Sequence, residues 1–359
     1  MKRIWFLCVI LIALIALPVS ATSSFFGGNL SFDWYAADSL FPESIADPMS
    51  SVTTLHVLNV LEGQPRTIRV EGADTYDDAP IYTGDKYADE TLYLQVKTGV
   101  NLGLFRWSFQ NYVQAEFTFQ GALNSVFQGF GGADNLGFDG IFFVGTNVRF
   151  FDIVALRFGL RHYSGHYGDE TLENMQTASS STATPIEYCR DNNLLAGISV
   201  FLGPFVRIYA DVSKPLGKSW MHPAVHIPSW VLKETSGQPL YLSVSEGEGI
   251  TAVAYPSNYK AWIIQTGAEL KVALPGGALF LASDVKLHQD GQTKHMPGQY
   301  SEQNPWEQEY TVGGGLEFDQ TNGDRKARIE VYYHSGRFPL LNFFYQRTSY
   351  VSVVFGISG

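Results

Sequence analysis

A histidine and a serine stand two positions apart, at His162 and Ser164, where a segment of alternating residues ends. Residues i and i+2 of a β-strand point to one face, so both continue the apolar stripe formed by Leu156, Phe158 and Leu160. A serine attacks an ester when a neighbouring base takes its proton, and a third group fixes the tautomer of that base. The spacing therefore predicts an esterase-type site with Ser164 as nucleophile and His162 as base.

The next strand-like segment supplies the third group. It begins at Asn192 and is expected to run antiparallel to the segment of His162. If Ile198 and Val200 of this segment face lipid, Asn192 lies on the same face as the imidazole. We expect Asn192 to orient His162, with an acidic residue such as Asp191 as the alternative orienter.

Acidic residues follow the serine closely. Asp169 and Glu170 carry hard oxygen ligands of the kind that calcium prefers, and a cation there would neutralise an oxyanion beside Ser164. The alternative is a solvated acidic loop without a cofactor. Calcium is the one cofactor that the residues suggest.

The elements that would position these residues form a regular series. Connections between strand-like segments alternate short and long along the chain, the pattern of an outer-membrane β-barrel with tight periplasmic turns and long external loops. The sequence predicts an all-β, transmembrane antiparallel barrel of about 12 strands, closed by pairing its first and last strands. The expected strands are residues 52–60, 91–105, 111–120, 138–150, 152–163, 192–201, 205–213, 259–273, 278–288, 308–318, 326–334 and 348–357.

Alternation within these strands assigns their faces. Arg157 and Arg161 lie opposite the apolar stripe of their segment and are expected in the lumen. A soluble β-sandwich would alternate in the same way, so the connection lengths and a secretory leader at residues 1–21 favour the barrel. A barrel of this size is narrow, and side chains can fill much of its lumen.

The chain divides into three parts. Residues 1–21 resemble a secretory signal peptide, with a charged start, an apolar run and a small-residue cleavage site at Val19-Ser20-Ala21. Residues 22–51 are expected to form a periplasmic N-terminal segment that plugs the mouth or docks on the base. Residues 52–359 are expected to form the barrel.

Composition agrees with a barrel and limits its partners. The chain has 19 Tyr, 25 Phe and 7 Trp but only 16% charged residues, as aromatic girdles and a lipid-facing band require. Its 24 basic and 35 acidic residues give no support for nucleic-acid binding, which needs a basic patch. The expected partners are outer-membrane lipids and the barrel assembly machinery, in a bacterial outer membrane of the Gram-negative type. The oligomeric state stays open.

Two resemblances add to this interpretation. His162, Ser164 and Asn192 resemble the His-x-Ser pair and nearby Asn of outer-membrane phospholipase A, although Gly165-His166 replaces the Asn-Gly that follows the serine there. More of the chain resembles a bacterial outer-membrane family defined as a domain of unknown function (number twelve-oh-seven). The matching motifs are Phe41–Pro48, His162–Glu170 and Tyr188–Asp191. This second resemblance implies an outer-membrane location and leaves the activity undefined.

Three functions remain open on the sequence alone. The default is a surface barrel with a structural or binding role carried by external loops. The second is a lipid acyl hydrolase, a serine esterase or phospholipase-type enzyme with its site on the lipid-facing wall. The third is a narrow selective channel. Its selectivity would come from the expected lumen residues Arg157, Arg161, Arg207, Glu116 and Asp211.

Overall fold

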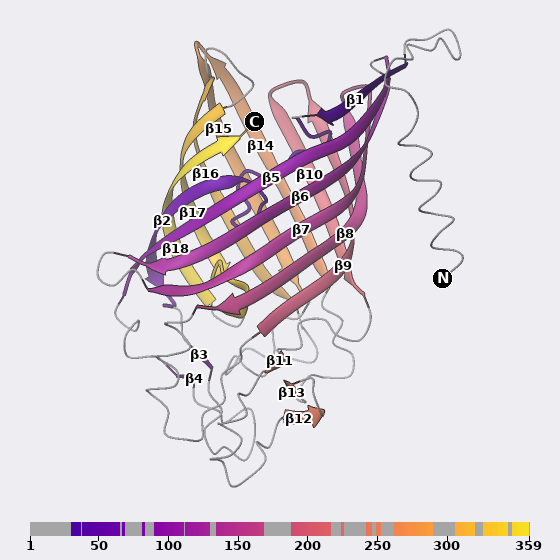
Figure 1. Ribbon diagram of the computed structural model, residues 1–359. Helices are drawn as coiled ribbons and strands as arrows, with labels where there is room; N and C mark the ends of the chain where they lie inside the picture. The colour runs from indigo at the N-terminus through magenta and orange to yellow at the C-terminus, as the bar shows by residue number, and fades with distance from the viewer. Residues whose placement is uncertain are drawn as a thin grey trace.

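Twelve long antiparallel strands close into a barrel in the computed structural model of the chain (Figure 1). The predicted fold class and strand number are confirmed. The leader 1–21 lies outside the residues that the structure describes. Described are residues 30–36, 38–64, 67–68, 81–82, 90–110, 112–129, 134–168, 188–216, 224–225, 242–245, 249–252, 262–289, 306–319, 326–343 and 347–358.

The strands follow one another around the wall in chain order. The last strand pairs with the first through registers such as Val353↔Val57, which is the predicted closure. The wall strands are β2 (Thr53–Glu62), β5 (Leu92–Phe109), β6 (Val113–Gln128), β7 (Asn135–Phe150), β8 (Val154–Tyr167), β9 (Tyr188–Leu202), β10 (Val206–Pro215), β14 (Ile263–Leu274), β15 (Gly277–His288), β16 (Glu307–Asp319), β17 (Lys326–Arg337) and β18 (Arg347–Ser358).

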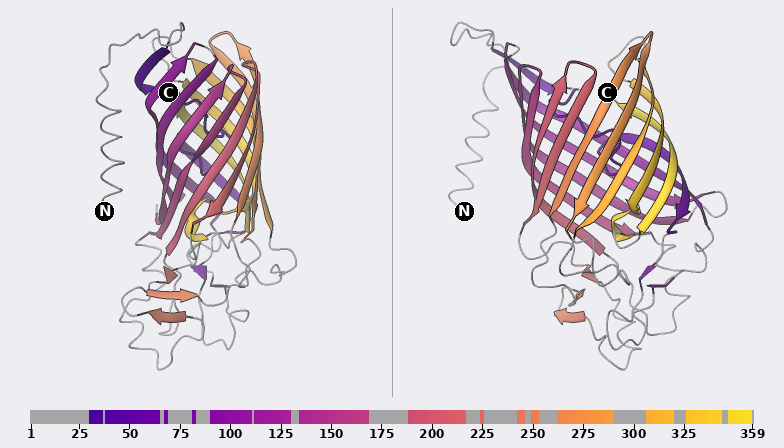
Figure 2. Two further views of the ribbon diagram at one scale, coloured as in Figure 1. Left: turned by 90° about the vertical axis from the view of Figure 1, so that its right-hand side faces the viewer. Right: turned by 180° about the vertical axis from the view of Figure 1, so that it is seen from behind.

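Short turns join strands at one end of the barrel. Between β7 and β8 the chain reverses through residues 151–153, where Phe151 and Asp152 have φ angles of 51° and 56°. This tight left-handed turn fixes the register Phe150↔Val154, and all later pairs of the hairpin follow from it. The longer connections leave from the opposite end (Figure 2). They hold the short strands β3 (Thr67–Ile68), β4 (Ile81–Tyr82), β11 (Ala224–Val225), β12 (Leu242–Ser245) and β13 (Gly249–Ala252).

The two faces of the wall differ in chemistry. Outward side chains are apolar, as shown by Phe158, which is 61% exposed, and Leu281, which is 57% exposed. Inward positions of the same strands are largely polar and buried, among them Arg157 and Arg161 as predicted. This arrangement turns the apolar surface toward lipid and the charges toward the lumen. Within the described residues, no helix has the length and apolarity to cross a membrane.

The described part of residues 22–51 adds to the wall before it enters the lumen. Strand β1 (Leu30–Ala36) pairs with the part of β5 that β2 leaves uncovered, with Phe32 opposite Trp107. The rings of these two residues lie 5.4 Å apart, and Trp34 meets Phe105 at 6.1 Å. Aromatic side chains therefore gather at the short-turn end, where a barrel meets the membrane interface.

Residues 38–51, which we call the plug, lie inside the barrel. Leu40 and Phe41 are each only 1% exposed, and the plug backbone bonds to charged lumen side chains. Glu116 accepts a hydrogen bond from the Leu40 amide at 2.9 Å, and Lys97 donates one to the Pro48 carbonyl at 3.0 Å. These bonds satisfy backbone groups that would otherwise be buried without partners.

Ion pairs hold the same segment at two further points. Lys286 Nζ lies 2.6 Å from Asp47 Oδ1 and 3.4 Å from Glu309, and Arg157 lies 3.4 Å from Glu43. All five side chains are largely buried. The plug thus supplies carboxylates that balance cations of the wall.

A second segment enters the lumen from the long-connection end. Residues 338–343 include the 3-10 turn η2 (Leu341–Phe343), and the Pro339 carbonyl accepts a hydrogen bond from Asn124 at 3.0 Å. Leu341 packs with Met49 of the plug against a shared apolar cluster that contains Tyr163. The two segments therefore meet within the barrel.

Loss of the Lys286 charge should destabilise the barrel strongly. Lys286→Met leaves Asp47 and Glu309 as buried carboxylates that have lost their shared cation, which costs about 3–5 kcal/mol when a buried pair is broken. Denaturant unfolding of the refolded barrel in lipid vesicles measures the loss in free energy of unfolding.

Lys326→Met is the matched control. Lys326 pairs with Glu317, but its side chain is 43% exposed, so a loss of less than about 1 kcal/mol is expected. Equal losses in the two variants would contradict the structural role of the plug contact.

Candidate active site on the outer wall

Three adjacent strands bring the candidate residues to one outward row. Pairing places Phe142 of β7 opposite His162 of β8, and His162 opposite Asn192 of β9. Residues directly opposite in an antiparallel pair share a face. Since Phe158 and Leu160 of β8 are exposed to the outside, this row also lies on the outer wall.

His162 and Asn192 are joined by a hydrogen bond. The distance from His162 Nδ1 to Asn192 Oδ1 is 2.8 Å. The amide oxygen has no proton to give, so Nδ1 must donate. In the neutral ring, Nε2 then carries the lone pair, which is the tautomer that a general base requires.

Ser164 lies on the same face, one step nearer the long-connection end. Its Cα is roughly 7 Å from that of His162, the spacing of i and i+2 in a strand. Among the described residues, the contacts of the hydroxyl include no hydrogen bond to the imidazole. The structure therefore brings His162 and Asn192 into contact and places Ser164 on the same face. The hydrogen bond between Ser164 and His162 would have to form when a substrate binds.

Gly140, which lies opposite Ser164, leaves room for the serine side chain to turn toward the imidazole. Gly140 of β7 pairs with Ser164, and a Cβ added at Gly140 would lie 2.9 Å from Ser164 Oγ and 2.8 Å from the Phe142 ring. Such distances are too short for a carbon atom without a shift of its neighbours. A side chain at position 140 would thus crowd the candidate nucleophile.

Two aromatic contacts frame the pair and were missed by the sequence analysis. The His162 and Phe142 rings stack at 6.1 Å and 26°, and those of His166 and Phe138 at 4.8 Å and 21°. The register of the β7–β8 hairpin would have predicted both contacts, but this register depends on the three-residue length of the turn at 151–153. Stacking limits the rotation of His162 about its side-chain bonds.

The remaining candidates are not placed. Asp169 and Glu170, the expected calcium ligands, lie outside the described residues, and for Asp191 only the backbone is described, as part of β9. Within the described part of the chain, no three His, Cys, Asp or Glu side chains gather as metal ligands would.

The charged residues expected to make a channel selective are paired inside the lumen. Arg157 lies 2.5 Å from Asp211, Arg207 lies 3.2 Å from Glu269, and Glu116 binds Arg106 at 2.6 Å. The Arg207 and Glu116 pairs link neighbouring strands, and the Arg157 pair reaches from β8 across β9 to β10. Arg161 is the exception, because it donates to Ser213 and no described carboxylate lies within ion-pair distance of it.

Comparison with solved structures finds other barrels at low similarity. Outer-membrane phospholipase A from Escherichia coli is 11% identical over 82% of this chain and 92% of that one, with a TM-score of 0.40. The Pseudomonas putida toluene transporter TodX is 12% identical over 95% and 98%, with a TM-score of 0.35. The NanC porin is 10% identical over 74% and 98%, with a TM-score of 0.34. No family model and no curated protein matches the chain.

The architecture of this chain is that of an outer-membrane β-barrel. Its wall closes through β18 and β2, its exterior is apolar and its interior is polar. Closure satisfies every strand edge in the wall, which the hydrocarbon region of a membrane demands. The outer-membrane location expected from the sequence agrees with this wall.

The tautomer of His162 is directly measurable. Nitrogen NMR of barrel labelled at histidine should show His162 protonated at Nδ1 in its neutral form, because Asn192 Oδ1 accepts that proton. Asn192→Leu should shift the population toward the Nε2-protonated form. A neutral wild-type ring protonated at Nε2 would contradict the hydrogen bond.

Proposed function

We propose that the protein is a lipid acyl hydrolase of the outer membrane. Ser164 acts as nucleophile, His162 as general base and Asn192 as the residue that holds the imidazole. The observation that carries the proposal is the 2.8 Å contact of His162 Nδ1 with Asn192 Oδ1, which leaves Nε2 as the nitrogen able to take a proton.

The reaction follows from these roles. Ser164 Oγ attacks the acyl carbonyl while His162 Nε2 takes its proton, and the protonated imidazole then gives that proton to the departing alcohol. Water, with its proton taken by His162, then attacks the acyl-serine ester, and His162 returns that proton to Ser164 Oγ as the fatty acid leaves. Asn192 keeps the ring in one tautomer and one orientation throughout both steps.

The position of the site selects a lipid substrate. His162 and Ser164 follow the lipid-exposed residues Phe158 and Leu160 toward the long-connection end of β8. An acyl ester of an outer-leaflet lipid meets the wall at this depth, with its chain against the apolar face and its headgroup near water. We place calcium at Asp169 and Glu170 as an optional aid to the oxyanion.

The alternatives fit the geometry less well. A selective channel needs a continuous path, whereas the plug and residues 338–343 both occupy the described lumen and meet at Met49 and Leu341. A structural or binding role through external loops gives no reason for a hydrogen-bonded imidazole on the outer wall. Polar groups facing lipid are costly, so their presence there points to a functional role.

We also propose membership of the domain-of-unknown-function family (number twelve-oh-seven) resembled by the sequence. The two longest motifs of that family fall on the plug and on the strand of the candidate site. Residues Phe41–Pro48 lie in the plug, and residues His162–Glu170 begin at the candidate site. Export by the leader 1–21 and insertion by the barrel assembly machinery complete the proposal.

Fatty-acid release should depend on Ser164. Refolded barrel is mixed with phospholipid and with lipopolysaccharide, with and without calcium, and free fatty acid is measured. Ser164→Ala should lower the rate by at least roughly 1,000-fold because no other nucleophile replaces it. Asn192→Ala should lower kcat by a smaller factor, roughly 10- to 100-fold, since the base remains but its orientation is lost.

The matched control is Ser125→Ala. Ser125 is an outward, half-exposed serine of β6 in the row of Phe138 and His166, so its loss tests general damage to this face. It should keep the wild-type rate. Release that survives Ser164→Ala would refute the mechanism, and a folded wild type without release from either lipid would refute the function.

A further inference from the structure

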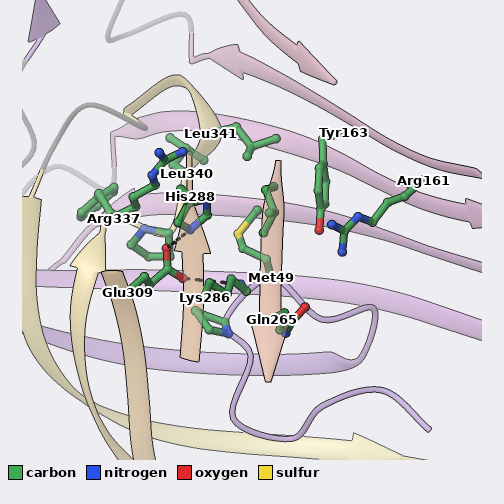
Figure 3. A pocket seen from close by; sticks show the side chains of 14 residues that line it. Met49, Arg161, Tyr163, Gln265, Lys286, His288, Glu309, Arg337, Leu340 and Leu341 are labelled. Carbon is green, nitrogen blue, oxygen red and sulfur yellow. Dashed lines mark hydrogen bonds and ion pairs between the residues drawn. The ribbon is translucent and has the colours of Figure 1, made fainter. Parts of the chain in front are cut away.

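A cavity lies in the lumen between the plug and residues 338–341. Figure 3 shows Met49 of the plug with Arg161 and Tyr163 on one side of it and Lys286, Glu309 and His288 on the other. Leu340 and Leu341 cover it from the long-connection end. The free space is about 50 Å³, which corresponds to roughly four water-sized groups.

Arg161 borders this cavity with most of its hydrogen-bonding capacity unused. The residue is 7% exposed, its Nη2 donates to Ser213 Oγ, and its guanidinium lies 4.9 Å from the Tyr163 ring centroid. Its Nε is buried and has no hydrogen-bond partner. No described carboxylate lies within ion-pair distance of it, although a guanidinium carries five N–H donors.

The other lumen arginines show that this is unusual within the described wall. Arg106, Arg157 and Arg207 each have a carboxylate within 3.2 Å. An arginine buried without such a partner is costly, because the desolvation of its charge is not offset. The wall therefore holds one buried positive charge, on Arg161, that an anionic ligand can neutralise.

The rest of the lining restricts the ligand. Met49, Ile263, Leu340 and Leu341 give the cavity apolar walls, whereas Lys286 and Glu309 already neutralise each other in part. A cation at one side of an apolar space fits a carboxylate with a short alkyl tail. The available space limits the whole ligand to about two to four carbons, with the carboxyl carbon included.

We propose that this cavity binds a short-chain monocarboxylate, with its carboxylate on Arg161 and its alkyl tail against Met49 and Leu341. The site is separate from His162 and Ser164, which lie on the outer face of the same strand, so the proposal does not depend on hydrolysis. Arg161 and Tyr163 point inward where His162 points outward.

Calorimetric titration of the folded barrel with sodium butyrate tests the site, with acetate as the shorter probe and n-butanol as the uncharged one. Saturable binding of butyrate is expected, with none of butanol at the same concentrations. Arg161→Gln should weaken butyrate binding by at least tenfold. Arg149→Gln, which removes a guanidinium paired with Asp152 near the short-turn end, should bind butyrate as the wild type does.

A second readout covers the case in which Arg161→Gln fails to fold. In wild-type barrel, NMR should give nuclear Overhauser contacts between butyrate protons and the methyl groups of Met49 and Leu341. Absence of saturable binding to the wild type, or binding without these contacts, would overturn the proposal. So would a folded Arg161→Gln variant that binds butyrate with unchanged affinity.

Discussion

Charge pairing inside the barrel is the constraint on which the rest of the structure depends. Because the wall turns its apolar side chains toward lipid, its charged residues face the lumen, where a buried charge is costly unless it has a partner. Asp47 reaches Lys286 at 2.6 Å and Glu43 reaches Arg157 at 3.4 Å, so the plug completes pairs that the wall begins. The plug is therefore part of the core of this barrel. Its removal would leave Lys286 with Glu309 alone and Arg157 with Asp211 alone, and would expose these buried pairs.

The plug and residues 338–343 enter the lumen and meet there, so the outer wall is the surface on which a membrane lipid can meet reactive groups. There the chain carries His162 in a hydrogen bond to Asn192, with Phe142 stacked on the imidazole and Gly140 leaving room at Ser164. A polar pair on a lipid-facing row is costly, and its retention needs a compensating role. Interior pairing and exterior chemistry are thus two consequences of one arrangement, in which each strand presents opposite properties to its two sides.

Alternation and connection length were enough to predict the barrel, its closure and the inward position of Arg157 and Arg161. They also predicted Asn192 on the face of His162, because period two carries a face along each strand. The contacts of the plug were not predictable, since residues 38–51 lack periodicity and their partners lie far away in sequence. The stack of Phe142 on His162 needed the exact turn at Phe151 and Asp152, and alternation cannot supply a register across a hairpin.

The conductance of the folded barrel in a planar lipid bilayer tests directly whether the lumen is closed by its own paired charges. Because Asp47 and Glu43 are bound to the wall and Met49 and Leu341 pack on one cluster, we expect no steady ion current at moderate voltage. A steady open-channel current from wild-type barrel would contradict it. That result would favour a channel function.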